Sequence, residues 1–167
     1  MTPFTINPAT PDEVPALLGM IRELAEFEQL AHQLEVTADS LRDALFGKDA
    51  VARALLARMK GGEPAGYAVF FRTFSTFVGR PGIFLEDLFV RPSFRQLGIG
   101  RALLTEVAKN GLELGGGRFE WITLRWNENA FRFYRSIGAS VMSEWALLRM
   151  NGNEVCELVN AKVKVKP

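Results

Sequence analysis

The stretch Arg91–Leu104, RPSFRQLGIGRALL, decides the fold that we expect for this chain, because it joins two apolar runs of different period. The run before it, Ile83–Val90 (IFLEDLFV), predicts a strand, and the run after it, Gly100–Leu114, predicts a helix. A helix that begins directly behind a glycine turn directs the free N–H groups of its first turn, and the positive end of its dipole, at one point. Gly98 and Gly100 let the main chain approach a ligand closely there, so the loop suits a phosphate group.

Two better-known phosphate loops do not fit this stretch. A Walker loop ends in Gly-Lys followed by Ser or Thr, a sequence that is absent here. The dinucleotide-binding fingerprint needs a third glycine where Leu103 stands. From the glycines alone a second interpretation stays open, in which they only form a tight turn between strand and helix.

The sequence on either side predicts an α/β fold, a mixed, mainly antiparallel sheet with helices on both faces, in one domain over residues 1–167. Thr10 as cap, Pro11 at the first helical position and Glu13 in a capping box predict the first helix. Lys60–Pro64 is a turn cluster that predicts a hairpin between two strands. After a first strand and this first helix, the predicted elements are a helix at Thr37–Phe46, strands at Val51–Met59, Gly66–Thr73 and Ile83–Val90, the helix at Gly100–Leu114, a strand at Phe119–Trp126, a helix at Ala130–Ile137 and a last strand at Val141–Met150.

Composition excludes several classes of function. Of the 167 residues 48% are apolar and the formal net charge is +1, so a packed core is available but no overall field attracts nucleic acid. No apolar run of about 18 residues is present, and the N-terminal MTPFTINPAT has no basic segment with an apolar one behind it. We therefore expect a soluble cytoplasmic protein without nucleic-acid or membrane partners. With one cysteine, Cys156, and one histidine, His32, we expect neither an internal disulfide nor a metal site.

Two separated motifs carry a resemblance to a known family. Arg95, Gly98 and Gly100 form the pattern Arg-x-x-Gly-x-Gly, and Asn127–Ala139 (NENAFRFYRSIGA) follows the pattern Asn-x-x-Ala-x-x-Phe-Tyr-x-x-x-Gly-Ala. In both, the chain resembles the GNAT superfamily of N-acetyltransferases, in which the first motif is the acyl-CoA pyrophosphate loop. Through the segment IRELAEFE of the first helix and the acidic pair in FLEDLFV, it resembles more particularly the diamine acetyltransferases, the spermidine/spermine N-acetyltransferase group.

The resemblance implies a GNAT-type acyl-CoA N-acyltransferase fold that takes acetyl-CoA as cosubstrate and requires no metal. It also implies a homodimer that pairs across the late strands, with the C-terminal run Val155–Val165 exchanging or covering a sheet edge. The residues that it assigns to acetyl-CoA are Leu88, Phe89, Val90, Arg95, Gln96, Leu97, Gly98, Ile99, Gly100, Arg101, Asn127, Ala130 and Tyr134.

Glu86 is the first candidate for a general base. A protonated amine, with a pKa of about 10.4 in water, has no lone pair for attack on a thioester until a base removes a proton. Glu86 has apolar neighbours in its strand, so we expect partial burial and a raised pKa, and the resemblance places its counterpart as a base, directly or through water. Strand alternation predicts Asp87 on the opposite face. The resemblance further assigns the oxyanion to main-chain N–H near Phe89 and the leaving sulfur to Tyr134. The alternatives are a surface carboxylate at Glu86 and a packing tyrosine at Tyr134.

Carboxylates at the end of the first helix indicate a cationic acceptor. Glu26 and Glu28 lie on the side of that helix away from its apolar stripe, a pattern that also fits a solvated surface. In the polyamine-acetylating relatives this helix end borders the acceptor site, and an acidic rim favours a cationic amine. Asp87 either attracts that amine or binds a loop. The residues assigned to the acceptor are Glu26, Phe27, Glu28, Glu86, Asp87 and Glu144.

The chain departs from the long-polyamine enzymes before its predicted last strand. Those relatives carry an acidic segment and a tryptophan there, whereas this chain reads Ser140–Trp145 (SVMSEW) and is shorter. A smaller diamine, a lysine-like amino acid such as thialysine, or another primary amine is therefore as good a candidate as spermidine. We expect an acetyl-CoA-dependent N-acetyltransferase that transfers the acetyl group directly to a small cationic amine. A non-catalytic acyl-CoA-binding regulatory module and a peptide or protein N-acetyltransferase are the alternatives.

Overall fold

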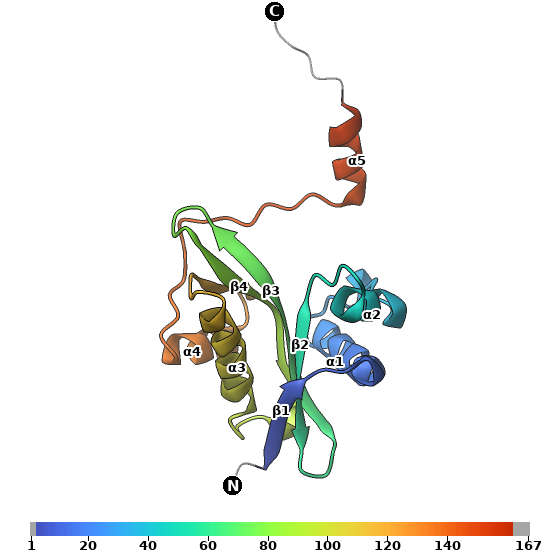
Figure 1. Cartoon of the computed structure of the whole chain (residues 1–167), viewed down its shortest axis with the longest axis vertical. Coiled ribbons are helices and arrows are strands. Elements are labelled where there is room, and N and C mark those ends of the chain that lie inside the picture. The colour runs from blue at the N-terminus through green and yellow to red at the C-terminus, as the bar shows by residue number, and fades with distance from the viewer. Residues whose placement is uncertain (1–2, 162–167) are drawn as a thin grey trace, which may run out of the picture. The chain divides into compact units, whose positions relative to one another are not determined.

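The computed structural model describes residues 3–161, and the chain divides into two compact units, Met1–Leu124 and Arg125–Pro167. No helix in the described residues is long and apolar enough to cross a membrane. The elements of the first unit, in chain order, are β1 (Phe4–Pro8), α1 (Val14–Phe27), α2 (Ala38–Phe46), β2 (Arg53–Met59), β3 (Pro64–Ser75), β4 (Arg80–Val90), α3 (Ile99–Glu113) and β5 (Phe119–Trp121) (Figure 1).

The five strands lie in sequence order across one mixed sheet. Strands β1 to β4 pair antiparallel, and β5 adds a parallel edge strand beside β4. Helices α1 and α2 cover one face of this sheet and α3 covers the other (Figure 1). The predicted mixed, mainly antiparallel sheet with helices on both faces is confirmed.

Both early helices begin where the sequence predicts them. Thr10 precedes a 3-10 turn, Pro11–Glu13, that leads into α1, and the Glu13 carboxylate accepts the N–H of Thr10 at 2.8 Å. At α2 the cap is Thr37, whose hydroxyl oxygen accepts the N–H of Ser40 at 3.1 Å. Because such bonds satisfy main-chain donors that the helix itself leaves unpaired, they fix the residue at which each helix begins.

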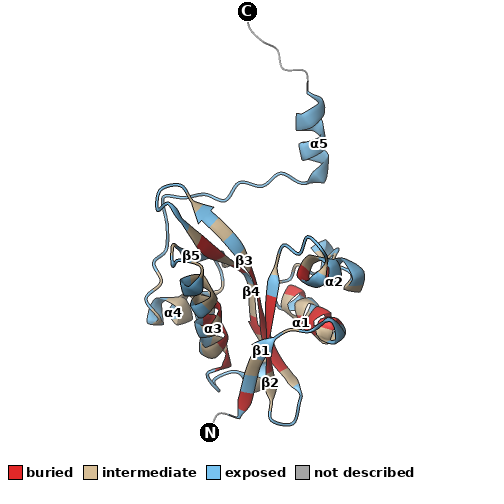
Figure 2. Cartoon of the chain, in the orientation of Figure 1, coloured by how far each residue is buried: buried red, intermediate tan, exposed pale blue. Residues whose placement is uncertain are grey.

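Buried residues lie in the strands of the sheet and in the helices on both of its faces (Figure 2). On the α3 side, a Cβ placed on Gly111 would lie 3.1 Å from Cγ1 of Ile83, so α3 packs directly on β4. On the other side is a second core, in which Tyr67 of β3 and Phe89 of β4 lie beneath α1. Its buried members are Val14, Leu17, Leu18, Met20, Leu41, Leu45, Ala54, Leu56, Tyr67, Val69 and Phe89.

The second unit differs from its sequence prediction. Helix α4 (Glu128–Ser136) lies where a helix is expected, but Val141–Met150 is not a strand, and α5 (Gly152–Asn160) follows it. A strand needs a neighbour to satisfy its main-chain polar groups, and within residues 3–161 no strand pairs with this segment. The predicted strand at Phe119–Trp126 is too long, since β5 ends at its third residue. Residues 162–165 of the run assigned to a dimer edge lie outside the described residues.

Gly66 is a point of close approach between β3 and β4, and it gives a first prediction. A Cβ on Gly66 would lie 2.5 Å from the carbonyl oxygen of Phe89, which belongs to the main chain and cannot swing away. We expect Gly66→Ala to lower the free energy of unfolding by about 2 kcal/mol, measured by urea denaturation. Gly61 lies in the β2–β3 turn with nothing within 4 Å of such a Cβ, so Gly61→Ala is the control. Equal stability of the two variants would contradict the close approach.

Candidate functional site

The loop between β4 and α3 ends in a helix start that can receive an anion. Gly98 caps α3 with a φ of 83°, in the left-handed region that favours glycine. The first helical bond runs from the N–H of Ala102 to the carbonyl oxygen of Gly98 at 3.0 Å. The N–H groups of Ile99, Gly100 and Arg101 therefore have no acceptor inside the helix. Ile99 is buried and offers only its main chain, whereas Arg101 is exposed. The backbone thus presents the free first-turn donors that the sequence analysis expects at this helix start.

Arg95 ties this loop to β4 and to the end of α1. Its Nε–H donates to the carbonyl oxygen of Val90 at 3.0 Å, and its guanidinium carbon lies 5.2 Å from the centroid of the Phe27 ring, within cation–π range. Phe27 is the last residue of α1, so the structure brings a predicted cofactor residue next to a predicted acceptor residue. Gln96 and Leu97 are exposed, and Gln96 has a φ of 66°, which is uncommon outside glycine.

Arg91, which the sequence analysis does not assign, anchors the start of the loop. Its Nε–H and Nη2–H groups donate to the Glu23 carboxylate of α1, the shortest bond being 2.6 Å, and Nη1–H donates to the carbonyl oxygen of Pro64 at 2.8 Å. One guanidinium therefore joins α1, the start of β3 and the end of β4. Two sequence features could have indicated this ion pair: an arginine directly after a predicted apolar strand, and a carboxylate one turn before Glu26.

A β-bulge interrupts β4 at Glu86. Strand β3 pairs Val69 with Asp87 and Phe70 with Leu85, so Glu86 is an extra residue on β4 without a partner across the ladder. The bulge breaks the two-residue period at this pair, so simple alternation no longer fixes the faces of Glu86 and Asp87. Leu85 packs into one core while Asp87, two residues on, pairs with Val69 of the α1-side core.

The bulge also decides which main-chain groups point away from β3. The N–H of Arg91 donates to the carbonyl oxygen of Ala65 on β3 at 3.0 Å. Residues of a strand turn their N–H and C=O alternately to the two sides, so Phe89 also faces β3. The groups that face the other edge are those of Leu88 and Val90. The outward N–H groups near Phe89 are therefore those of Leu88 and Val90, not that of Phe89 itself.

That other edge of β4 is only partly paired. Strand β5 pairs with β4 through three residues and stops at the pair Leu85–Trp121. Within residues 3–161 no strand pairs with the edge of β4 beyond that point. The segment from Glu86 to Val90 consequently presents main-chain donors and acceptors of the kind that an extended ligand can pair with.

Carboxyl groups gather on the α1 side of the bulge. Tyr67, which is wholly buried, donates its O–H to Oδ2 of Asp87 at 3.1 Å. Burial raises the pKa of Asp87 to about 6, the Glu86 and Glu28 carboxylates raise it as well, and the bond from Tyr67 opposes them. Burial also raises the pKa of Glu28. Asp87, Glu28 and Glu86 thus form one electrostatically coupled group, which favours a cation.

The exposure of the single carboxylates corrects one expectation. Glu86 is exposed, so the expected partial burial of its carboxyl is wrong. Of the two carboxylates at the end of the first helix, Glu28, which follows α1 directly, is half-buried and raises the pKa of Asp87, whereas Glu26 is exposed. Tyr67 was missed altogether, although a lone hydroxyl inside the apolar run of β3 was a signal that could have found it.

The other predicted residues lie in the second unit. The Oδ1 atom of Asn127 accepts the N–H of Ala130 at 3.1 Å, so this pair caps α4. Tyr134 lies on α4, half-buried, with its ring 5.3 Å from that of Phe133. Glu144 is exposed and accepts the hydroxyl of Ser143 at 3.1 Å.

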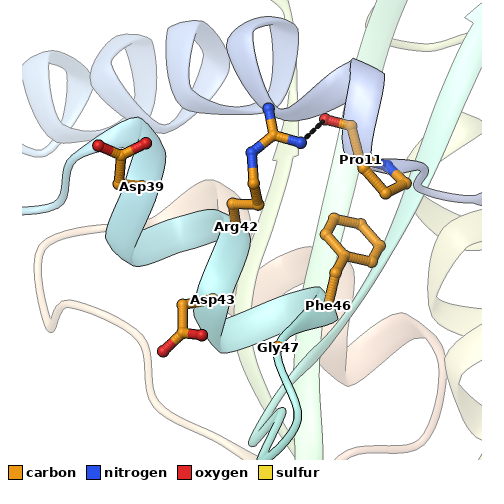
Figure 3. Close-up of a pocket in the computed structure, with 6 residues that line it drawn as sticks. All are labelled: Pro11, Asp39, Arg42, Asp43, Phe46 and Gly47. Atoms are coloured by element: carbon orange, nitrogen blue, oxygen red, sulfur yellow. Dashed lines mark hydrogen bonds between the residues drawn. The ribbon is translucent and has the colours of Figure 1, made fainter.

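A hollow elsewhere in the first unit does not coincide with this site. It lies between α2 and the turn before α1, where Nη1 of Arg42 donates to the carbonyl oxygen of Pro11 at 2.9 Å (Figure 3). None of the predicted cofactor or acceptor residues lines it. Its lining residues are Pro11, Asp39, Arg42, Asp43, Phe46 and Gly47.

A family description and three known proteins are similar to the chain. The acetyltransferase (GNAT) family matches residues 18–139, a span that contains β4, the loop and both sequence motifs. A thialysine N-epsilon-acetyltransferase of Caenorhabditis elegans is 36% identical over 91% of this chain and 94% of its own length. An L-ornithine N5-acetyltransferase of Arabidopsis thaliana is 32% identical over 89% of this chain and 84% of its own length. The structure of an integron cassette protein of V. cholerae covers 96% of this chain and 99% of its own, with a TM-score of 0.79 at 24% identity, and so shares the fold.

Proposed function

The chain belongs to the acetyltransferase (GNAT) family, and from this premise we infer that it transfers the acetyl group of acetyl-CoA directly to a primary amine of a small cationic acceptor. Family membership gives the enzyme class, N-acetyltransferase, and implies acetyl-CoA as cosubstrate. The observation that carries the acceptor class is the coupled carboxyl group of Asp87, Glu28 and Glu86 on and beside β4.

Two sets of main-chain groups fit acetyl-CoA. The first-turn N–H groups of α3 suit its pyrophosphate, and a Cβ on Gly98 would meet nothing within 4 Å, so there is open space at the cap. Leu88 turns its N–H and C=O groups, and Val90 its N–H group, to the open edge of β4, where they suit the amides of the pantetheine arm. The carbonyl oxygen of Val90 already accepts the Nε–H of Arg95. Arg101, exposed at the same helix start, adds positive charge for the phosphates.

We assign the proton transfers to Glu86 and Tyr134. Glu86 removes a proton from the ammonium group of the acceptor, directly or through water, and the freed nitrogen attacks the thioester carbonyl carbon. As the C–N bond forms, the carbonyl oxygen becomes an oxyanion that the N–H of Leu88 or Val90 stabilises. The C–S bond then breaks, and Tyr134 donates a proton to the departing thiolate. The nitrogen loses its second proton as it becomes an amide, and that proton restores the Tyr134 phenol through water. The exposure of Glu86 supports this role, because its carboxylate is accessible to a bound amine.

The acceptor is proposed to bind at Asp87 and Glu28. Both carboxyl groups are partly buried, so their charge attracts a cation more strongly than that of an exposed residue such as Glu26. The two relatives are named for thialysine and L-ornithine, amino acids whose side chains end in a primary amine. A lysine-like amine or short diamine is therefore the proposed substrate class.

Charge removal at the acceptor site gives a second prediction. We expect Asp87→Asn and Glu28→Gln each to raise the KM for thialysine about tenfold, with kcat changed less than about threefold, because each removes attraction for the cation. Glu26→Gln should change the KM less than about twofold. Steady-state kinetics at saturating acetyl-CoA measure this, and an equal effect of all three substitutions would contradict the assignment.

An acceptor panel tests the proposed function itself. CoA-thiol release is followed with diamines, polyamines, lysine analogues, aminoglycosides and peptides in parallel. We expect release with short diamines or lysine-like amines. Release with peptides alone would identify a peptide or protein N-acetyltransferase, and acetyl-CoA binding without release to any amine would identify a non-catalytic module.

We further propose a homodimer. Within the described part of the second unit many large apolar side chains are exposed, which favours their burial against another surface. They include Val141, Met142, Trp145, Leu147, Leu148, Met150, Val155, Leu158 and Val159. Light scattering at micromolar protein should give twice the monomer mass, and a monomer alone would contradict the proposal.

A further inference from the structure

We propose that Tyr67 is a positioning residue for the acceptor: its buried hydroxyl donates to the Asp87 carboxylate and so favours the ionised form that receives the cationic end of the amine. This inference rests on the proposed function, since it takes Asp87 as part of the acceptor site. It concerns a residue on β3 that carries no charge and lies outside both sequence motifs.

The position of the Tyr67 hydroxyl is set by packing. The residue is 0% exposed, and its ring lies 6.1 Å from that of Phe89 at an angle of 48° in the core beneath α1. A side chain enclosed in this way cannot follow a moving partner. The 3.1 Å bond to Oδ2 therefore fixes Asp87 rather than the reverse, and it leaves Oδ1 of that carboxylate for a ligand.

Tyr67 is the donor in its hydrogen bond to Asp87 over the whole working pH range. Burial and the nearby carboxylates raise the pKa of Tyr67 well above its ordinary value, so the phenol keeps its proton and donates. The groups that face Asp87 are Tyr67 from β3, Glu86 from β4 and Glu28, the residue directly after α1. Burial and both carboxylates favour the protonated form of Asp87. Among these groups Tyr67 alone favours the ionised form, which is the form that binds a cation.

Removal of the Tyr67 hydroxyl should therefore weaken acceptor binding by an amount that depends on pH. Asp87 has a pKa of about 6 with Tyr67 in place, so it is ionised above that pH and binds the acceptor there. In Tyr67→Phe the pKa of Asp87 should rise by about one unit, the scale of a hydrogen bond to a charged group. As the solution is acidified, Asp87 of the variant is then protonated at a higher pH than Asp87 of wild type. Above about pH 8 both proteins carry an ionised Asp87.

The experiment compares Tyr67→Phe with wild type across pH in the full chain, with thialysine as acceptor. We expect the KM for thialysine to rise about fivefold near pH 6 and the two proteins to converge above about pH 8. The KM for acetyl-CoA should stay unchanged. NMR titration of the Asp87 carboxyl carbon should show the same upward shift without any substrate. A purely structural defect would instead give a loss independent of pH and an unshifted titration, which would overturn the inference.

Asp87→Asn and the double variant separate this inference from the proposed function. If Tyr67 acts through Asp87, Tyr67→Phe should add nothing to the KM of Asp87→Asn, whereas independent effects would multiply. Multiplied effects, with Asp87→Asn still raising the KM, would overturn the role of Tyr67 and leave the acceptor site standing. An unchanged KM in Asp87→Asn would instead remove Asp87 from the acceptor site and the inference with it.

Discussion

Glu86→Gln is expected to lower turnover about 100-fold near neutral pH, and the loss is expected to shrink as the pH rises. Glutamine keeps the shape of the side chain but cannot take a proton from the ammonium group. At higher pH a larger fraction of the amine is already unprotonated, so a base is needed less. The measurement is kcat against pH for wild type and variant, with saturating acetyl-CoA and acceptor.

Two controls make this result specific to the base. Glu120→Gln removes another exposed carboxylate, on the neighbouring strand β5, and should leave kcat within about twofold of wild type. Tyr134→Phe should lower turnover without rescue at high pH, because departure of the thiolate does not depend on the charge of the amine. Wild-type turnover of Glu86→Gln across the whole pH range would show that another group takes the proton.

The second large effect is expected at the cap of α3. Gly98→Val should lower the affinity for acetyl-CoA at least about 100-fold, because it fills the open space beside the first-turn N–H groups and disturbs a φ of 83°. The fold should survive, since a non-glycine residue in the left-handed region costs only about 1–2 kcal/mol. Isothermal titration with acetyl-CoA and circular dichroism measure the two quantities.

Gly62→Val separates backbone strain from loss of the binding space. Gly62 has a φ of 85° and nothing within 4 Å of a Cβ, so valine there carries a comparable strain. It lies in the turn between β2 and β3, away from α3 in the chain. We expect this variant to lose a similar amount of stability and to bind acetyl-CoA as wild type does. Equal loss of affinity in both variants would contradict the phosphate-binding role of the loop.

Local signals made most of the first unit predictable. Thr10 and Thr37 are caps that act on their own helices, and the turn between β2 and β3 needs only the residues within it. Such features depend on a few neighbours in sequence, so composition and spacing reveal them. Val141–Met150 has the apolar content of a strand, but a strand also needs a partner, which no local pattern can specify.

The candidate site was predictable in its loop and not in its strand. Gly98 indicates a left-handed φ from the sequence alone, because few residues other than glycine adopt that conformation. The bulge at Glu86 has no such mark: IFLEDLFV reads as one continuous strand, and only the register against β3 reveals the extra residue. That single residue turns Phe89 toward β3 and Leu88 and Val90 toward the open edge. The role of Tyr67 was not predictable either, because its hydrogen-bond partner, Asp87, lies on the neighbouring strand, 20 positions away in the sequence.

The most direct test of acetyl transfer to a small amine is a single-turnover experiment. Enzyme in excess over acetyl-CoA with an isotope-labelled acetyl group is mixed with thialysine and quenched at successive times, and products are quantified by mass spectrometry. We predict that N-acetylated thialysine carrying the label and free CoA appear together in equal amounts, with no labelled protein at any time. Acetyl-CoA that stays intact while bound, or label that accumulates on the protein or only on added peptides, would contradict direct transfer to a small cationic amine.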